Sequence, residues 1–156
     1  MTPVITIGPA FANGIRPGTM EGGAMNIDDA TRFAKRHEDV YNNDFEHYAD
    51  LYSEGFTAFR PAQGMTQSRA EMVALEQRAT AACPDRKTQV LRVLAGQGDW
   101  FGIEELWQGT NTGGDERFGP TGTKVSVYAF SLYEVRDGKF ARAVAWTGRP
   151  PGEGLK

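Results

Sequence analysis

The sequence is poor in the residues that most often build covalent or metal-bound sites. Among its 156 residues there is one cysteine and there are two histidines. The single cysteine, Cys83, has no partner for an internal disulfide, so we expect a reducing compartment, the cytoplasm. The histidines, His37 and His47, lie ten positions apart and with Cys83 form no ligand set. We therefore expect no metal site and no cofactor.

The chain also lacks a surplus of positive charge and a long apolar run. Lys and Arg number 17 against 20 Asp and Glu, which gives a formal net charge of -3. A protein that binds a polyanion needs a basic surface, so we predict no nucleic-acid partner. The longest uncharged stretches contain Gly or Pro and fall short of a membrane span, so we predict no membrane partner.

The sequence does contain the helix caps and turn residues expected of one small α+β domain. Asn26 and the capping box Ser68-Arg69-Ala70-Glu71 mark the starts of two helices, and Asp44 starts a shorter one between them. Alternating apolar residues bounded by turn residues predict the strands 56–60, 89–95, 100–108, 125–136 and 139–147. Three helices that precede a curved antiparallel sheet follow the α+β plan.

The expected domain leaves a short segment at each end. Gly and Pro residues are scattered through the first 25 positions and recur at the end of the chain. We expect residues 1–25 to be an arm or tail, residues 26–148 to be the single domain, and residues 149–156 to be a second tail. The Asp137-Gly138 hairpin turn between the last two strands places Arg136 opposite Lys139 and Tyr133 opposite Arg142.

Five turn motifs in this order of elements carry a family resemblance. They are Cys83-Pro84-Asp85, Gly98-Asp99, Gly109-Thr110-Asn111-Thr112-Gly113, Pro120-Thr121-Gly122 and Asp137-Gly138-Lys139. Over residues 25–148 the chain resembles the SnoaL-like polyketide cyclases of the nuclear transport factor 2-like superfamily. The resemblance implies a cone-shaped α+β fold whose curved antiparallel sheet wraps around three N-terminal helices. Known members include cofactor-free cyclases, isomerases, epoxide hydrolases and dehydratases, beside proteins that only bind, so the resemblance selects no single chemistry.

The residues that perform chemistry in this family are replaced here. Its cyclases use an aspartate near the end of the last strand, whereas residues 142–148 include no acid. Asn111 stands where the family's Gly-Thr-His-Thr-Gly turn has histidine, which keeps a hydrogen-bonding side chain and removes a titrating one. Related steroid isomerases place their base just before a proline on the first strand, where this chain has Arg60. If the protein is an enzyme, its acid/base group lies elsewhere.

Glu105 is the leading candidate for that group. Every second residue from Phe101 to Trp107 is large and apolar except Glu105, so strand alternation places one carboxylate on an apolar face. Burial there would raise its pKa toward neutrality, which suits a group that takes and returns a proton. The alternative is structural, because the Gly98-Asp99 turn places Arg92 opposite Glu105 and predicts a cross-strand ion pair.

Four further residues are candidates for the same reaction. Arg142 or Asn111 would stabilise a developing oxyanion, and Tyr41 or His37, on one stripe of the first helix, would orient the reacting groups. The simpler alternatives are a surface charge for Arg142 and a hydrogen-bonded core residue for His37. The side chains expected to bind substrate are Tyr48, Tyr52, Phe56, Phe59, Met72, Trp107, Tyr133 and Trp146. Their aromatic bias suits a flat, hydrophobic ligand.

Three functions remain open at this stage. The first is cofactor-free acid/base chemistry, of cyclase or isomerase type, on a small hydrophobic carbonyl compound of polyketide, terpenoid or steroid kind. The second is a binding protein that keeps the pocket without the chemistry, and the third is a dimeric scaffold with a filled cone. An open pocket that contains Glu105 without Arg92 favours the enzyme, whereas a closed cone favours the scaffold.

The outer face of the sheet predicts a homodimer. The last two strands would present there a row of apolar side chains too large to leave in water. The row consists of Tyr128, Phe130, Leu132, Ala141, Ala143 and Ala145.

Overall fold

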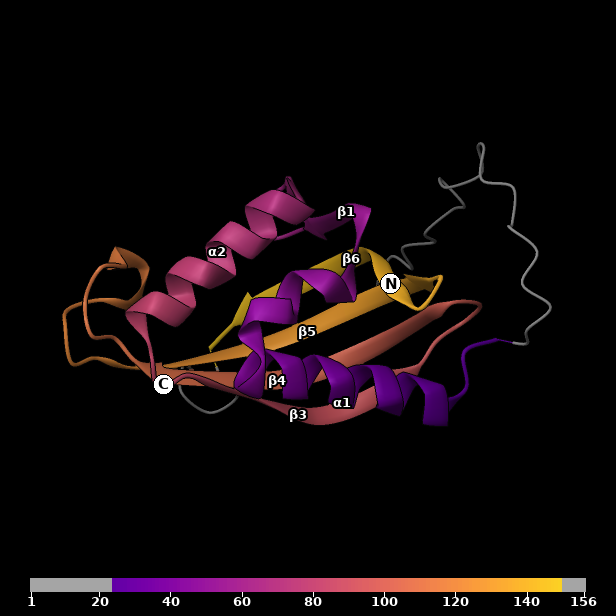
Figure 1. The fold of residues 1–156 in the computed structure, drawn as a ribbon, viewed down its shortest axis with the longest axis horizontal. Coiled ribbons are helices and arrows are strands. Elements are labelled where there is room, and N and C mark those ends of the chain that lie inside the picture. The colour runs from indigo at the N-terminus through magenta and orange to yellow at the C-terminus, as the bar shows by residue number, and fades with distance from the viewer. Residues whose placement is uncertain (1–23, 150–156) are drawn as a thin grey trace, which may run out of the picture.

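The computed structural model describes residues 24–149, in which the predicted helices and strands are present (Figure 1). In chain order the elements are α1 (Ile27–Asn43), the 3-10 helix η1 (Phe45–Leu51), β1 (Tyr52–Arg60), β2 (Met65–Ser68), α2 (Arg69–Ala82), β3 (Lys87–Ala95), β4 (Trp100–Thr110), the 3-10 turn η2 (Glu116–Phe118), β5 (Lys124–Arg136) and β6 (Lys139–Gly148). The sequence did not predict β2, and β1 begins four residues earlier than expected. The proposed arm and tail lie outside the described residues, except for positions 24, 25 and 149.

Both α-helices begin at the caps that the sequence marks. Asn26 Oδ1 accepts a hydrogen bond from the backbone N–H of Asp29 at 2.8 Å. Ser68 and Glu71 form the predicted capping box, in which each side chain accepts from the backbone N–H of the other residue. These bonds satisfy N–H groups that a helix leaves unpaired in its first turn. The caps thereby fix which face of α1 and of α2 is turned toward the sheet.

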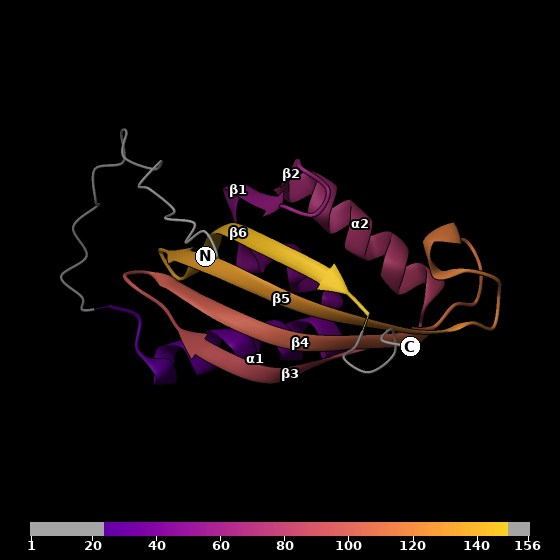
Figure 2. The same ribbon diagram turned by 180° about the vertical axis from the view of Figure 1, so that it is seen from behind.

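The strands form one curved, unclosed sheet in the order β2-β1-β6-β5-β4-β3. Strands β3 to β6 pair antiparallel in succession, but β1 pairs with β6 in parallel. The predicted curved sheet is therefore present, but it is mixed rather than antiparallel throughout. Helix α2 carries the chain from the β1–β2 edge to β3 at the opposite edge, and three antiparallel reversals then bring β6 beside β1 in the same direction. Figures 1 and 2 show α1, η1 and α2 on one face of the sheet.

A longer turn and a one-residue bulge correct the predicted registers. In the β3–β4 hairpin Gly96 pairs with Trp100, so the loop has three residues instead of two and Arg92 lies opposite Glu104. In the β5–β6 hairpin the predicted Arg136–Lys139 pair forms. A shift between Glu134 and Val135 then places Arg142 opposite Glu134 instead of Tyr133. Because side chains alternate between faces, an extra residue in one strand sends every later side chain to the other side.

The core lies between the helices and the concave face of the sheet. It is rich in aromatic rings, and its fully buried members include Tyr52, Phe56, Phe101 and Phe140. Tyr52 and Phe140 pack with ring centroids 5.3 Å apart, which ties β1 to β6. None of the described helices is long and apolar enough to cross a membrane.

Candidate active site

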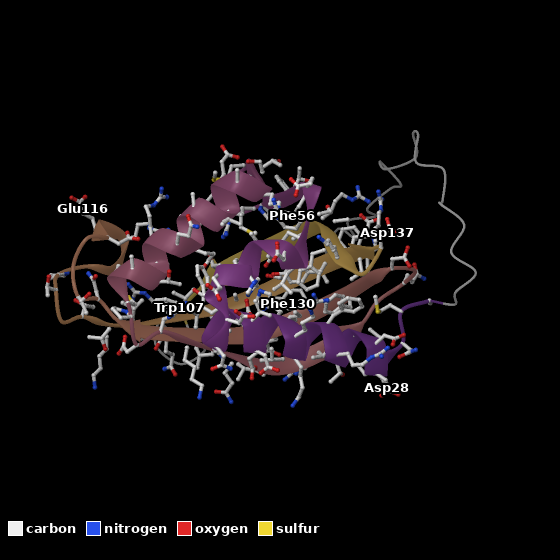
Figure 3. All side chains as sticks on the ribbon, in the orientation of Figure 1. Asp28, Phe56, Trp107, Glu116, Phe130 and Asp137 are labelled. Carbon is white, nitrogen blue, oxygen red and sulfur yellow. The ribbon has the colours of Figure 1, made fainter. Side chains whose placement is uncertain are left out.

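A cavity of about 270 Å³ lies between α2, α1 and the concave face of the sheet. Both α-helices and the sheet contribute to its wall. His37 and Tyr41 come from α1, Glu76 from α2, and Glu105 and Trp107 from β4. In Figure 3, Phe56 and Trp107 lie in the interior between the helices, whereas Glu116 and Asp137 lie at the periphery. The cone is therefore hollow rather than filled.

Glu105 is inside this cavity. Its side chain is 13% exposed, and its carboxylate lies 3.6 Å from His37 Nδ1 and 3.5 Å from Thr88 Oγ1. Among residues 24–149 no Lys or Arg forms an ion pair with it. Burial raises its pKa to about 7, against the hydrogen bond from Thr88 and with a smaller contribution from the negative charge of Glu38. The group therefore changes protonation near neutral pH.

The alternative partner for Glu105 is engaged elsewhere. Arg92 Nε lies 3.1 Å from Glu104 Oε2, and the Tyr128 hydroxyl also donates to Glu104. Glu104 and Tyr128 lie on the convex face of the sheet, because neighbouring strand residues point to opposite sides. The predicted Arg92–Glu105 pair is wrong, because the turn between β3 and β4 is one residue longer than predicted.

His37 is buried beside Glu105 without a hydrogen-bond partner. The residue is 3% exposed, and neither ring nitrogen has a hydrogen bond in the structure. Burial lowers its pKa to about 4, although the negative charges of Glu76 and Glu38 oppose the shift. At neutral pH the ring is uncharged and offers one donor and one acceptor. It is therefore not the hydrogen-bonded core histidine of the alternative interpretation, and a ligand in the cavity would satisfy it.

Tyr41 connects a second carboxylate, Glu76, to the strand that carries Glu105. The Tyr41 hydroxyl donates to Glu76 Oε2 at 2.9 Å and accepts from Trp107 Nε1 at 2.7 Å. Sequence reasoning missed Glu76. The signal was present, because Met72, Glu76 and Ala79 recur at helical spacing and so share the buried stripe of α2.

Two of the proposed oxyanion partners lie outside the cavity. Arg142 is on the convex face, where its Nε lies 2.5 Å from Glu134 Oε2 and its guanidinium covers the Trp100 ring. Asn111 is 2% exposed and holds the β4–β5 connection. Its side chain donates to the Gly119 carbonyl at 2.7 Å and accepts from the Gly113 N–H at 3.0 Å. The structure thus gives both residues structural partners.

The predicted substrate-binding residues divide between the two faces of the sheet. Those that line the cavity are Tyr48, Phe56, Met72, Trp107 and Tyr133. Tyr52 is buried behind them, with its hydroxyl donating to Tyr48 at 2.8 Å. Phe59 and Trp146 are on the convex face, 44% and 39% exposed, so their assignment to the pocket is wrong. The bulge near Ala141 moves Trp146 outward and turns Ala143 inward.

One exposed group of metal-binding side chain types occurs in the described part of the chain. Asp44, Glu46 and His47 place their ligand atoms within 4.8 Å of one another on η1 and the residue before it. His47 Nδ1 already lies 2.7 Å from Asp44 Oδ1. None of the three residues lines the cavity.

The curved sheet, the helices on one face and the enclosed pocket define an α+β cone of the nuclear transport factor 2-like type. Residues 33–143 match the model of the SnoaL-like domain, so the chain belongs to that family. No functionally curated protein matches it.

Solved structures share the fold at low sequence identity. AclR from Streptomyces galilaeus, a proposed hydroxylase, superposes with a TM-score of 0.70 at 20% identity, over 81% of this chain and 83% of AclR. IdmH from Streptomyces antibioticus, a proposed polyketide cyclase, gives 0.63 at 18% identity, over 76% and 91% of the two chains. A proposed polyketide cyclase from Acidithiobacillus ferrooxidans gives 0.63 at 20% identity, over 80% and 92%.

Proposed function

We propose that the protein is a cofactor-independent acid/base enzyme that acts on a small hydrophobic carbonyl compound. Glu105 is the proton-transfer group. The observation that carries the proposal is a carboxylate inside an aromatic cavity with no cationic partner among the described residues. Such a group can take up a proton and release it near neutral pH, which matches the pKa of about 7.

The surroundings of Glu105 fit a carbonyl substrate. His37 supplies an unused N–H donor or acceptor next to the carboxylate. The Tyr48 hydroxyl accepts from Tyr52, which leaves its own proton for an oxygen in the cavity. Donors held in a water-poor site stabilise the negative charge that develops on a carbonyl oxygen. These residues replace Arg142 and Asn111 as the proposed oxyanion partners.

Two features narrow the substrate class. The walls are mostly aromatic and aliphatic, which suits a flat, apolar molecule. Two of the structurally similar proteins are proposed polyketide cyclases, so we favour a polyketide-like substrate over a terpenoid or a steroid.

A binding protein without chemistry is the second candidate. One observation favours it: β6 presents Ala143, Ala145 and Thr147 to the cavity, so the strand that holds the acid in the family's cyclases contributes none. The scaffold hypothesis is disfavoured, since a cavity of about 270 Å³ remains inside the cone.

The test is proton exchange on a simple ketone. The purified protein is incubated with 1-tetralone in D₂O near neutral pD, and deuterium uptake next to the carbonyl is followed by mass spectrometry. We expect exchange above the buffer rate, and we expect Glu105→Gln to lower it by about 100-fold or more, as loss of a general acid/base group does. Glu104→Gln is the matched control, since it removes the neighbouring carboxylate on the convex face and should leave exchange intact.

The outcomes separate the two candidates. If the wild type binds 1-tetralone by calorimetry and gives only the buffer rate of exchange, the binding protein is favoured. Equal exchange by wild type and Glu105→Gln would remove Glu105 from the reaction.

A further inference from the structure

We propose that Glu76 is a second catalytic carboxylate, which removes a proton from carbon while Glu105 protonates the oxygen of the same carbonyl group. This inference rests on the proposed function and deepens it, because it gives each side of the cavity a separate part in the reaction. Glu76 enters from α2 and Glu105 enters from β4, so a bound molecule has a carboxylate on its helix side and another on its sheet side.

The position of Glu76 is held by a chain of two hydrogen bonds. Tyr41 on α1 donates to Glu76 Oε2 at 2.9 Å, and Trp107 on β4 donates to the Tyr41 hydroxyl at 2.7 Å. Trp107 is two residues from Glu105 on the same face of β4. The strand that carries Glu105 therefore also sets the position of Glu76, through Tyr41 as the positioning residue.

His37 provides independent evidence that a polar ligand belongs between the two carboxylates. Its ring is 3% exposed and lines the cavity with both nitrogens unpaired. An unpaired donor and acceptor in a buried place destabilise the protein, so such groups usually have partners. A carbonyl or enol oxygen in the cavity would pair with His37 and place the adjacent carbon within the space shared by Glu76 and Glu105.

The charges around the cavity give the two carboxylates different roles. Burial raises the pKa of Glu76, whereas the Tyr41 hydrogen bond and the positive charge of Arg60 oppose that rise. The negative charge of Glu105 adds to the rise, so the two carboxylates repel each other. Glu105 lacks a cationic partner among the described residues and takes up a proton near pH 7. We therefore assign the proton to Glu105 and the ionised state to Glu76, which the Tyr41 hydrogen bond and the charge of Arg60 favour.

The step balances without another reactant. The C–H bond next to the carbonyl breaks, and its proton goes to Glu76. The released electron pair forms a carbon–carbon double bond, and the carbonyl π electrons form an O–H bond with the proton of Glu105. The product is the enol, with Glu76 protonated and Glu105 ionised. The reverse step restores the ketone and the starting protonation states. If Glu76 has first exchanged its proton for solvent deuterium, the ketone is returned labelled.

The experiment compares Glu76→Gln, Glu105→Gln and the control Glu116→Gln in the 1-tetralone exchange assay. Gln at position 76 still accepts the Tyr41 hydrogen bond, and Glu116 is an exposed residue of η2 outside the cavity. We expect Glu76→Gln to lower kcat by about 100-fold or more with KM changed by less than about threefold. Glu116→Gln should match the wild type.

Each result decides one proposal or both. Exchange by the wild type and by Glu76→Gln, but not by Glu105→Gln, overturns the role of Glu76 and leaves the proposed function standing. Absence of exchange by the wild type overturns both. If Glu76→Gln does not fold, Glu76→Asp provides the test. This substitution moves the carboxylate back by one methylene, so kcat should fall by about tenfold or more. A wild-type rate in Glu76→Asp would overturn the inference.

A titration independent of turnover tests the pair itself. In protein labelled with ¹³C at the glutamate carboxyl, the signals of Glu76 and Glu105 are assigned from the two Gln variants and followed against pH. Because electrostatic coupling is reciprocal, each variant should lower the midpoint of the remaining carboxyl. An unchanged midpoint in both variants would mean that the two carboxylates are not electrostatically coupled, which overturns the inference.

Discussion

Arg92 lies 3.1 Å from Glu104 and faces away from Glu105, its expected partner. The β3–β4 turn produces this relationship: Gly96 pairs with Trp100, so the loop has three residues instead of the predicted two, and Arg92 falls opposite Glu104 on the convex face. An exposed ion pair thereby forms outside, and an unpaired carboxylate is left inside. The proposed chemistry depends on this separation, because a guanidinium beside Glu105 would hold the carboxyl ionised at neutral pH.

The stability of the protein should reveal the state of Glu105. Its folded pKa of about 7 lies above the ordinary value of 4.5, so between those pH values the folded state binds more protons than the unfolded state. Unfolding free energy therefore falls as pH rises from 4.5 to 7, by about 3 kcal/mol. Glu105→Gln should be more stable than the wild type at pH 8 by up to about 3 kcal/mol. The difference should vanish near pH 4.5.

Urea denaturation at several pH values measures this difference. His37 has the opposite slope, since its pKa falls from 6.5 to about 4 on folding and its contribution is lost as pH drops through that window. The subtraction of wild type from Glu105→Gln cancels the His37 contribution. A difference that does not vary between pH 5 and pH 8 would contradict a buried, titrating Glu105.

Tyr41→Phe should change the pH dependence of exchange as well as its rate. The hydrogen bond that the Tyr41 hydroxyl donates lowers the pKa of Glu76, so loss of this bond should raise that pKa. The acid limb of the rate profile should then move to higher pH, because the base is ionised later. Trp107 Nε1 also loses its acceptor, which should cost about 1–3 kcal/mol of stability.

A matched control for this variant is Tyr128→Phe, which removes a hydroxyl that binds Glu104 on the convex face. It should leave the profile in place. A uniform loss of rate in Tyr41→Phe, with the acid limb unmoved, would make Tyr41 a structural residue only.

Asn111→Ala should weaken the loop and leave the chemistry intact. The substitution leaves the Gly119 carbonyl and the Gly113 N–H without their partner in a site that is 2% exposed. We expect a loss of about 1–3 kcal/mol in thermal or urea unfolding. Arg117 and Phe118 of the same connection line the cavity, so KM should rise with little change in kcat. A large fall in kcat at constant KM would instead show that Asn111 acts in the reaction.

We expect a second copy of the chain to cover the convex face. The register places Phe59, Leu132 and Val144 in one row there, with Phe130 and Trp146 beside them. The predicted alanines are not part of that row, since Ala143 and Ala145 line the cavity. Trp146→Lys should shift sedimentation toward the monomer, with Lys87→Ala, on β3, as a surface control. A wild type that sediments as a monomer at high concentration would contradict the expected homodimer.

The sequence predicted what depends on neighbours along the chain. The caps at Asn26 and Ser68 were readable because a side chain and the N–H groups it satisfies are two or three residues apart. The place of Glu105 among Phe101, Ile103 and Trp107 was readable because alternation is local to β4. The turn motifs were similarly sufficient to indicate the family.

Only the tertiary structure decided what faces what. A turn one residue longer than predicted separated Arg92 from Glu105, and one extra residue in β6 sent Arg142 and Trp146 to the convex face. Bulges follow from the twist and packing of the whole sheet, so no local sequence pattern predicts them. Glu76 was indicated only by its helical spacing from Met72 and Ala79, and a charge on a helix is usually solvated; the approach of Tyr41 from α1 and Trp107 from β4 shows that this carboxylate faces the cavity. The local sequence thus determined which helix or strand carries each carboxylate, and packing between distant segments placed both carboxylates at one cavity.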